Sequence, residues 1–312
     1  MSIDRYIFET MPQSVGLFLT LVVFSTCLLV SQPTWARDWQ PVRGGVLFGI
    51  SGMALVEQQS HTLNFLIVHD NKQSNQGRLA IISIHNYEQA QYLPVEWTTH
   101  TPLPVDLEAI TAVPGKNNTD FIALTSFGKA YYLQLDAGKK TVAAIEQFNL
   151  PPLPKGSNLE AFALQNIDDK LVAMWAHRGA GAEPAIVYWG ILDLVKYQIT
   201  LAGSSSLQVP FPSENVRHIS DLKIDPTGVV YITSASDAGD DGPFQSAVYI
   251  AGSLGFNSNK IIWRQNSEFI PLHRSHYRKI EAIELVSGAK GGVVLGTDDE
   301  NLGSYVYIMG EK

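Results

Sequence analysis

A short pattern recurs five times along the chain, and its spacing constrains the fold more than any other feature of the sequence. In each copy a small or acidic residue, here called the anchor, opens an apolar segment, and a second apolar segment follows. The anchors are Ser51, Glu108, Glu160, Asp221 and Glu281. Their nearly even spacing is typical of arrays of similar units. Equivalent residues of a closed array converge on one axis, so the anchors also indicate where a site would lie.

Each unit contains short apolar runs that are rich in β-branched and aromatic residues and are bounded by turn residues, which predicts buried strands. The expected second strands are 64–68, 121–124, 171–175, 229–232 and 293–295, and the expected third strands are 79–84, 130–135, 185–189, 247–250 and 305–308. A weaker fourth segment, such as 92–97, closes each unit. Pro94 in this segment suits an outer, edge-type strand.

The fifth unit runs out of chain after its third strand. The candidate for its missing fourth strand is Val42 to Phe48, which precedes the first anchor. The sequence therefore predicts an all-β fold, a five-bladed β-propeller of four-stranded blades in which an N-terminal strand completes the last blade. An open β-sandwich also has short strands at regular spacing and is the alternative fold. We expect no helix of any length outside the N-terminal segment.

The first 36 residues do not follow the repeat. Val15 to Val30 is almost entirely apolar, and a short segment ending at Ala36 follows it, as in a signal peptide with its cleavage site. An uncleaved membrane anchor is the alternative. We therefore expect an exported protein, periplasmic or extracellular, with a signal peptide at 1–36 and a single propeller domain at 37–312. The one cysteine, Cys27, lies in the apolar run, so the expected domain needs no disulfide.

The charge balance narrows the class of partner. The chain has 22 Lys and Arg against 30 Asp and Glu, a net charge of −8. This balance disfavours nucleic acid and anionic membrane surfaces as partners. We expect instead a small anionic or phosphorylated ligand or an extracytoplasmic protein, no membrane contact beyond the signal segment, and a monomer.

The residues that follow the second strand of each unit should share a rim with the anchors, because neighbouring strands in a blade are antiparallel. Asp70, Ser126, His177, Asp237 and Asp298 follow their anchors at nearly constant intervals. The predicted mouth of the central channel thus gathers two rings of acids. Such carboxylates repel one another unless their pKa values rise or a hard cation lies among them. Alternatively, the anchor carboxylates accept backbone N–H bonds and tie adjacent blades together.

Oxygen ligands with little nitrogen or sulfur favour Ca²⁺ or Mg²⁺, which we expect at this rim as the cofactor. The candidate metal ligands are Asp70, Glu108, Glu160, Asp221, Asp237 and Glu281, and the candidate catalytic residues are His177, Arg178, Asp298 and Asp299. Arginines at the rim suit a phosphate or carboxylate ligand, or they neutralise the acids. The runs 237–241 and 298–301 read equally well as solvated acidic turns. A weaker alternative is a zinc site from His177, His218, His273 and His276.

The recurring Leu-Glu-Ala-Ile pattern resembles the Asp-Leu-Glu-Gly-Ile and Glu-Gly-Leu motifs of the esterase-like phytase and SdiA-regulated propeller families. The matching stretches are 106–110, 157–162 and 280–283, and 296–301 is similar to a Ser-Asp-Asp-Asn turn of phytase-like proteins. The resemblance implies a secreted propeller with metal-dependent phosphoesterase chemistry, in which Glu108, Glu160, Glu281 and Asp298 handle the cation. Alanine replaces the motif glycine in each copy, and Ser51 replaces the first acid.

Three functions fit these observations: an exported binding propeller, a metal-assisted hydrolase of an ester, and a scaffold whose rim acids only brace the channel. In the hydrolase the cation polarises the substrate and activates water, and Arg178 or Arg278 holds the anionic group. A propeller fold does not decide among them. Because the motifs depart from the enzyme pattern, the sequence favours binding over catalysis.

Overall fold

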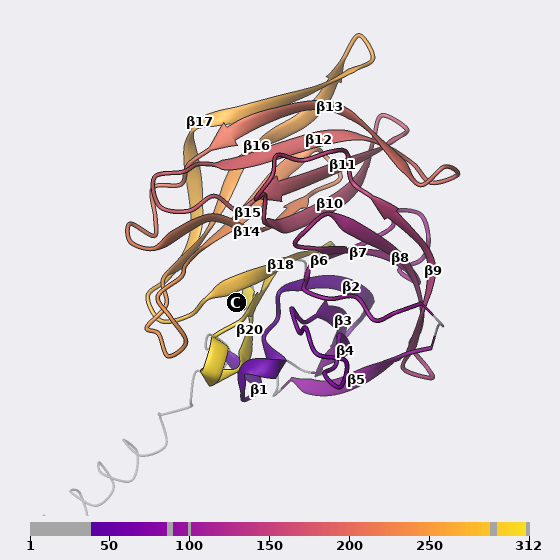
Figure 1. Ribbon diagram of the computed structural model, residues 1–312, viewed down its shortest axis with the longest axis vertical. Coiled ribbons are helices and arrows are strands. Elements are labelled where there is room, and N and C mark those ends of the chain that lie inside the picture. The colour runs from indigo at the N-terminus through magenta and orange to yellow at the C-terminus, as the bar shows by residue number, and fades with distance from the viewer. Residues whose placement is uncertain (1–38, 86–89, 99–100, 288–291, 310–312) are drawn as a thin grey trace, which may run out of the picture. The chain divides into compact units, whose positions relative to one another are not determined.

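A computed structural model describes residues 39–85, 90–98, 101–287 and 292–309. Within these ranges the strands form five four-stranded blades that follow one another in chain order around a central axis (Figure 1). The predicted five-bladed propeller is confirmed. The predicted signal peptide, residues 1–36, lies outside the described residues.

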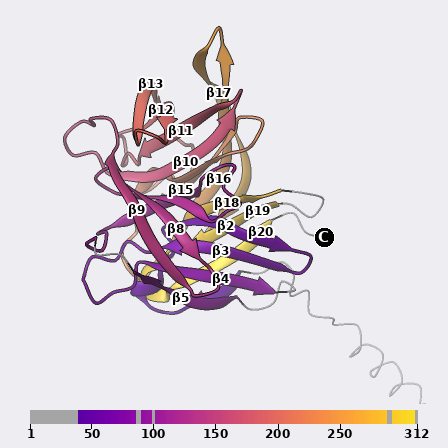
Figure 2. The same cartoon turned by 90° about the vertical axis from the view of Figure 1, so that its right-hand side faces the viewer.

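Each blade is an antiparallel meander that starts at the axis and runs outward. Blade 1 is β2 (Gly52–Gln59), β3 (Thr62–Val68), β4 (Leu79–His85) and β5 (Gln91–Trp97); blade 2 is β6 (Leu107–Ala112), β7 (Asp120–Thr125), β8 (Lys129–Asp136) and β9 (Thr141–Asn149). Blade 3 is β10 (Leu159–Ile167), β11 (Lys170–His177), β12 (Ala185–Asp193) and β13 (Gln198–Leu207); blade 4 is β14 (Val216–Ile224), β15 (Val229–Ser236), β16 (Ser246–Asn257) and β17 (Lys260–Ser275). Blade 5 is β18 (Ile280–Val286), β19 (Gly292–Thr297), β20 (Ser304–Met309) and β1 (Gln40–Arg43). The long hairpin of β16 and β17 projects from blade 4 (Figure 2).

An N-terminal strand completes blade 5, as predicted, but it lies earlier than Val42 to Phe48. Strand β1 pairs antiparallel with β20 through Gln40↔Val306 and Pro41↔Tyr305. The chain then leaves the sheet at Gly45, whose φ of 102° favours glycine, and Val46–Phe48 forms the 3-10 turn η2. The apolar character of 46–48 therefore marks a turn at the rim and not a strand.

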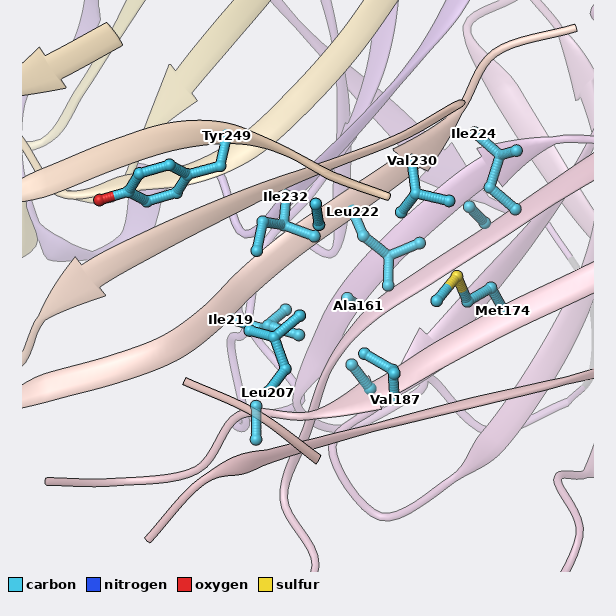
Figure 3. Packing of buried hydrophobic residues seen from close by; sticks show 14 of the residues in the cluster. Ala161, Met174, Val187, Leu207, Ile219, Leu222, Ile224, Val230, Ile232 and Tyr249 are labelled. Atoms are coloured by element: carbon cyan, nitrogen blue, oxygen red, sulfur yellow. The ribbon is translucent and has the colours of Figure 1, made fainter. Parts of the chain in front are cut away.

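The hydrophobic core consists of five clusters, one between each pair of neighbouring blades. Between blades 3 and 4, Ala161 and Met174 pack with Leu222 (Figure 3). Between blades 5 and 1, Ala282 packs with Met53, so packing closes the ring as well as strand pairing. Inner strands that are buried between two blades explain why the anchors open nearly continuous apolar runs.

The outer strands of blades 1 and 2 pair in parallel through Glu96↔Thr141 and Trp97↔Val142, which joins these blades into one sheet. The helical elements among the described residues are the 3-10 turns η2 and η3 (Glu300–Leu302). In the same ranges, no helix has the length and apolar character that crossing a lipid bilayer requires.

Candidate functional site

One backbone hydrogen bond recurs at the rim of four blades and defines which residues are equivalent. The residue after the second strand donates its N–H to the backbone carbonyl of the residue that comes directly before the inner strand. The bonds are Ser126 to Asp106 (3.0 Å), Arg178 to Asn158 (3.0 Å), Asp237 to Asn215 (2.7 Å) and Asp298 to Lys279 (3.0 Å). The residues two positions after these acceptors are Glu108, Glu160, Arg217 and Glu281. These four side chains therefore form the inner ring of the rim, with an arginine as the member from blade 4.

Blade 1 contributes Ser51 and Asp70 at the corresponding positions. Gly52 pairs with Val68 there, as Ala109 pairs with Leu124 in blade 2. The Ser51 side chain is 2% exposed, and its hydroxyl oxygen has no hydrogen-bond partner within the described part of the chain. The first blade thus brings an unpaired hydroxyl instead of a carboxylate.

Asp221 does not belong to the rim, which corrects its assignment as the fourth anchor. It lies deep in β14, beyond an irregular stretch that lengthens this strand between Arg217 and Asp221. Its buried carboxylate accepts the N–H of Ile283 in blade 5 at 2.9 Å and that of Leu222 at 2.7 Å. The contacts of Asp221 therefore match the alternative in which a carboxylate accepts backbone N–H bonds and ties adjacent blades together, here blades 4 and 5.

The small residue that follows each anchor has a packing role. In blade 1 a Cβ added to Gly52 would lie 3.0 Å from the Ile110 nitrogen of blade 2. Blade 4 departs from this arrangement, because Arg217 pairs with Ala235 and Asp221 pairs with Thr233, further along the strand. From there the Asp221 carboxylate accepts the N–H of Ile283 in blade 5. The recurrent alanine after each glutamate thus reflects close contact between blades. A short pattern of this kind arises from propeller geometry and does not require descent from one enzyme family.

Five basic side chains around the mouth are each held by a carboxylate. Arg178 lies 3.1 Å from Glu160, Arg217 lies 3.0 Å from Glu281 and 2.8 Å from Asp237, and Arg278 lies 2.8 Å from Asp299. Lys279 pairs with Glu281 at 3.1 Å and also with Glu300, and Lys72 lies 3.0 Å from Asp106. The rim arginines therefore neutralise acids. This is the second of the two roles that the sequence suggested for them, the first being the binding of a phosphate or carboxylate ligand.

Three carboxylates at the mouth lack a direct ion pair with any described residue, although Lys72 and Arg78 lie near Asp70 and Lys279 lies near Asp298. Among the described residues, Asp70, Glu108 and Asp298 form no ion pair and accept no side-chain hydrogen bond. Asp298 is 3% exposed and accepts only the Glu300 N–H, at 3.1 Å. Its carboxyl group packs directly on Gly49, where an added Cβ would lie 2.2 Å from the carboxyl carbon.

The pKa values of these acids are raised first by burial and then by repulsion from neighbouring acids. Burial raises the pKa of Asp298 well above its usual range, and the charge of Glu281 raises it further. Burial also raises the pKa of Glu108 well above its usual range, with added repulsion from Glu160, and burial and Glu281 raise the pKa of Asp70. For Glu160, burial outweighs the opposing arginines and raises the pKa to about 7. Burial and mutual repulsion therefore disfavour the fully ionised form of this acid set.

The other candidate residues have local structural contacts. His177 is the last residue of β11, and its Nδ1 lies 3.0 Å from the Asn158 carbonyl oxygen of its own blade, so Arg178 takes the place expected for His177. Asp299 is fully buried and accepts the N–H of Lys279 at 2.7 Å in addition to Arg278. Asp237 is half-exposed and paired with Arg217.

The histidines expected for a zinc site lie in separate surroundings. His218 Nε2 lies 2.9 Å from the Gly181 carbonyl oxygen, His273 packs against Trp39, and His276 packs against Phe211. Across the described ranges, no three His, Cys, Asp or Glu side chains are arranged so that they could hold a metal ion.

The structure adds Arg217 to the site. In the sequence this residue stood out only because it lies close to Asp221. Residue spacing does not identify it, because Arg217 lies 20 positions before Asp237, whereas the rim pairs of the other blades, such as Glu160 and Arg178, lie 17 to 19 positions apart. The irregular stretch inside β14 adds residues to this interval.

No family model and no curated protein matches the chain. Among solved structures it is similar to a thermostable family-43 glycoside hydrolase, with 12% identity, a TM-score of 0.49 and coverage of 85% of this chain and 90% of the other. It is also similar to an α-L-arabinofuranosidase from Podospora anserina, with 12% identity, a TM-score of 0.49 and coverage of 87% of this chain and 96% of the other. An α-L-arabinofuranosidase from Lactobacillus brevis is similar with 9% identity, a TM-score of 0.47 and coverage of 86% of this chain and 93% of the other. The family resemblance drawn from the Leu-Glu-Ala-Ile motifs is therefore wrong, because the similar structures are glycoside hydrolases and not phytase-like or SdiA-regulated proteins.

Proposed function

We propose that the chain is an exported ligand-binding propeller whose channel mouth binds a small organic cation. The observation that carries this proposal is the imbalance at the mouth, where the five bases are paired and Asp70, Glu108 and Asp298 are not. A carboxylate that is largely shielded from water and has few donors is costly, and a bound ammonium or guanidinium group would supply further donors. The ligand class is therefore cationic, in contrast to the anionic ligand expected from the sequence.

The position of the three acids supports a ligand larger than a single atom. Asp70 comes from blade 1, Glu108 from blade 2 and Asp298 from blade 5, which are consecutive blades of the ring, and the charge of Asp70 contributes to the raised pKa values of the other two. The unpaired hydroxyl of Ser51 lies at the blade 1 position of the inner ring. A planar guanidinium or an ammonium with several N–H groups can donate to acceptors placed in this way.

The test is a thermal melt of the purified protein with arginine amide and with putrescine as probes. A ligand that binds the folded state raises the midpoint by mass action. We expect a concentration-dependent rise with the wild type and none with the Asp298→Asn, Glu108→Gln double variant. Asp136→Asn, which changes an exposed acid in blade 2, is the matched control and should respond like the wild type. If neither probe raises the midpoint, or if the double variant responds equally, the proposal fails.

The same melt addresses the expectation of a Ca²⁺ or Mg²⁺ cofactor. The rim acids are hard oxygen ligands that suit either ion. A midpoint that rises with Ca²⁺ or Mg²⁺ and falls with EDTA, but is insensitive to both organic cations, would assign the mouth to a metal ion instead.

A further inference from the structure

Exposed apolar side chains gather on the face that carries the channel mouth. Among the described residues, ten large apolar side chains are exposed, and six of them lie on loops of the rim. These six, here called the apolar arc, are Val46, Leu47, Val105, Phe127, Tyr277 and Leu302, with exposures from 39% to 66%. Each lies just before an inner strand or just after a second strand. Single exposed apolar residues are ordinary, but several on neighbouring loops of one face, beside polar groups, favour an interaction site.

The apolar arc lies on the same loops as two of the unpaired carboxylates or on loops that contact them. The turns η2 and η3, which carry Leu47 and Leu302, contact each other. The Leu47 carbonyl accepts a hydrogen bond from the side chain of Asn71, the neighbour of Asp70, at 3.0 Å. Leu302 follows Asp298 in the same loop. The arc in this region therefore adjoins two of the three free acids.

Further along the rim, the arc continues into blade 2. Val105 precedes Asp106, whose carboxylate pairs with Lys72 and accepts the hydroxyl hydrogen of Ser126. Phe127 follows Ser126 directly. On the other side, Tyr277 precedes Arg278 and the start of β18. The apolar arc thus covers the rim of blades 5, 1 and 2.

The rim of blades 3 and 4 is polar and acidic in contrast. Its exposed acids are Glu183, Glu214, Asp240 and Asp241. Asn301 joins this part to the arc, since its N–H donates to the Asp240 carbonyl at 3.2 Å and its side chain to the Asp241 carboxylate at 3.0 Å. One face therefore combines an apolar arc, an acidic flank, and a mouth with three unpaired carboxylates.

We propose that this face docks a protein partner that inserts a lysine or arginine side chain, flanked by apolar residues, into the mouth. The inference rests on the proposed function, because the inserted side chain is the organic cation of that proposal. Charge complementarity selects a basic partner segment, and the apolar arc supplies contacts around it that a free small cation would not use. A buried charged group surrounded by apolar contacts is a common arrangement for the residues that dominate an interface.

The experiment compares two amidated five-residue peptides by calorimetry. One has a central arginine with two leucines on each side, and the other has the same arginine with two serines on each side. We expect the leucine peptide to bind at least tenfold more tightly. The Phe127→Ser, Leu302→Ser double variant should lose that gain but keep its affinity for the serine peptide. The matched control, Ile145→Ser with Leu201→Ser, changes exposed apolar residues on outer strands and should retain the gain.

The outcomes separate this inference from the proposed function. Equal affinity for the two peptides, with arginine amide still binding, overturns the docking surface and leaves the cation site intact. Failure of both peptides and of arginine amide overturns both. A leucine peptide with glutamine in place of the arginine that binds as tightly would also overturn the inference, because the charge would then contribute nothing.

Discussion

Arg217 of blade 4 donates a hydrogen bond to the carboxylate of Glu281 in blade 5 over 3.0 Å, and the two side chains are only 15% and 5% exposed. This contact joins two blades at the point where the inner ring changes from acid to base. Arg217 also pairs with Asp237, so one guanidinium compensates two carboxylates. A charge held in this way is difficult to remove, because its loss leaves a buried acid without its partner.

The first prediction concerns this pair. Arg217→Met, which keeps the side-chain stem and removes the charge, should lower the free energy of unfolding by about 2–4 kcal/mol, since Glu281 would keep only Lys279. Urea unfolding measures the change. Lys139→Met removes a cation from an exposed pair with Asp136 and should leave stability unchanged within error. Equal effects of the two substitutions would show that burial of the rim pair has no energetic consequence.

The second prediction concerns the contact of Asp221 with Ile283. Asp221→Ala should cost about 1–3 kcal/mol of stability, because the buried N–H of Ile283 loses its acceptor. Alanine stands at the matching register position of other blades, where Ala54 pairs with Leu66 and Ala163 pairs with Met174. Asp221→Asn keeps an oxygen that can accept this bond and should cost less than alanine. A loss of the same size in both variants would assign the effect to something other than the hydrogen bond.

The sequence predicted the architecture well because the propeller repeats one packing solution. Every inner strand is buried between two blades, so each unit carries the same apolar runs, and the unit without a fourth strand indicated the closure by β1. The exact strand was misplaced because the apolar residues 46–48 serve a rim turn. Hydrophobicity alone cannot separate these two uses, whereas Gly44-Gly45 marks the point at which the strand ends.

The site was predicted in part. Glu108, Glu160 and Glu281 lie in the inner ring, and Asp70 and Asp298 lie beside it. Spacing between anchors failed for blade 4, because extra residues inside β14 move Asp221 away from the rim and bring Arg217 to it. A strand has a side-chain period of two, so a shift within a strand also changes the face that a residue presents. Which acids are paired depends on long side chains from other blades and cannot be read from spacing.

The third prediction concerns pH. A carboxylate whose pKa is raised in the folded state contributes stability that is present below its unfolded pKa and is lost as the pH rises through the folded value. Burial and Glu160 raise the pKa of Glu108, so Glu108→Gln should become progressively more stable than the wild type from pH 5 to pH 8. Urea unfolding at each pH measures this difference. Glu146→Gln, at an exposed position in β9, should show a difference that does not vary with pH, and a flat profile for Glu108→Gln as well would contradict the prediction.

The last prediction uses the contact between Gly49 and Asp298. A Cβ at position 49 would lie 2.2 Å from the carboxyl carbon of Asp298, closer than atoms can approach, and the φ of −55° at Gly49 is one that alanine adopts without strain. Gly49→Ala should therefore displace the Asp298 carboxyl group, cost about 1–3 kcal/mol of stability, and abolish the rise in melting temperature with arginine amide. Gly44→Ala is the matched control, since nothing lies within 4 Å of its added Cβ. If Gly49→Ala lowers stability but keeps the full response to arginine amide, Asp298 is a structural acid, and the cation site must be built from Asp70 and Glu108 without it.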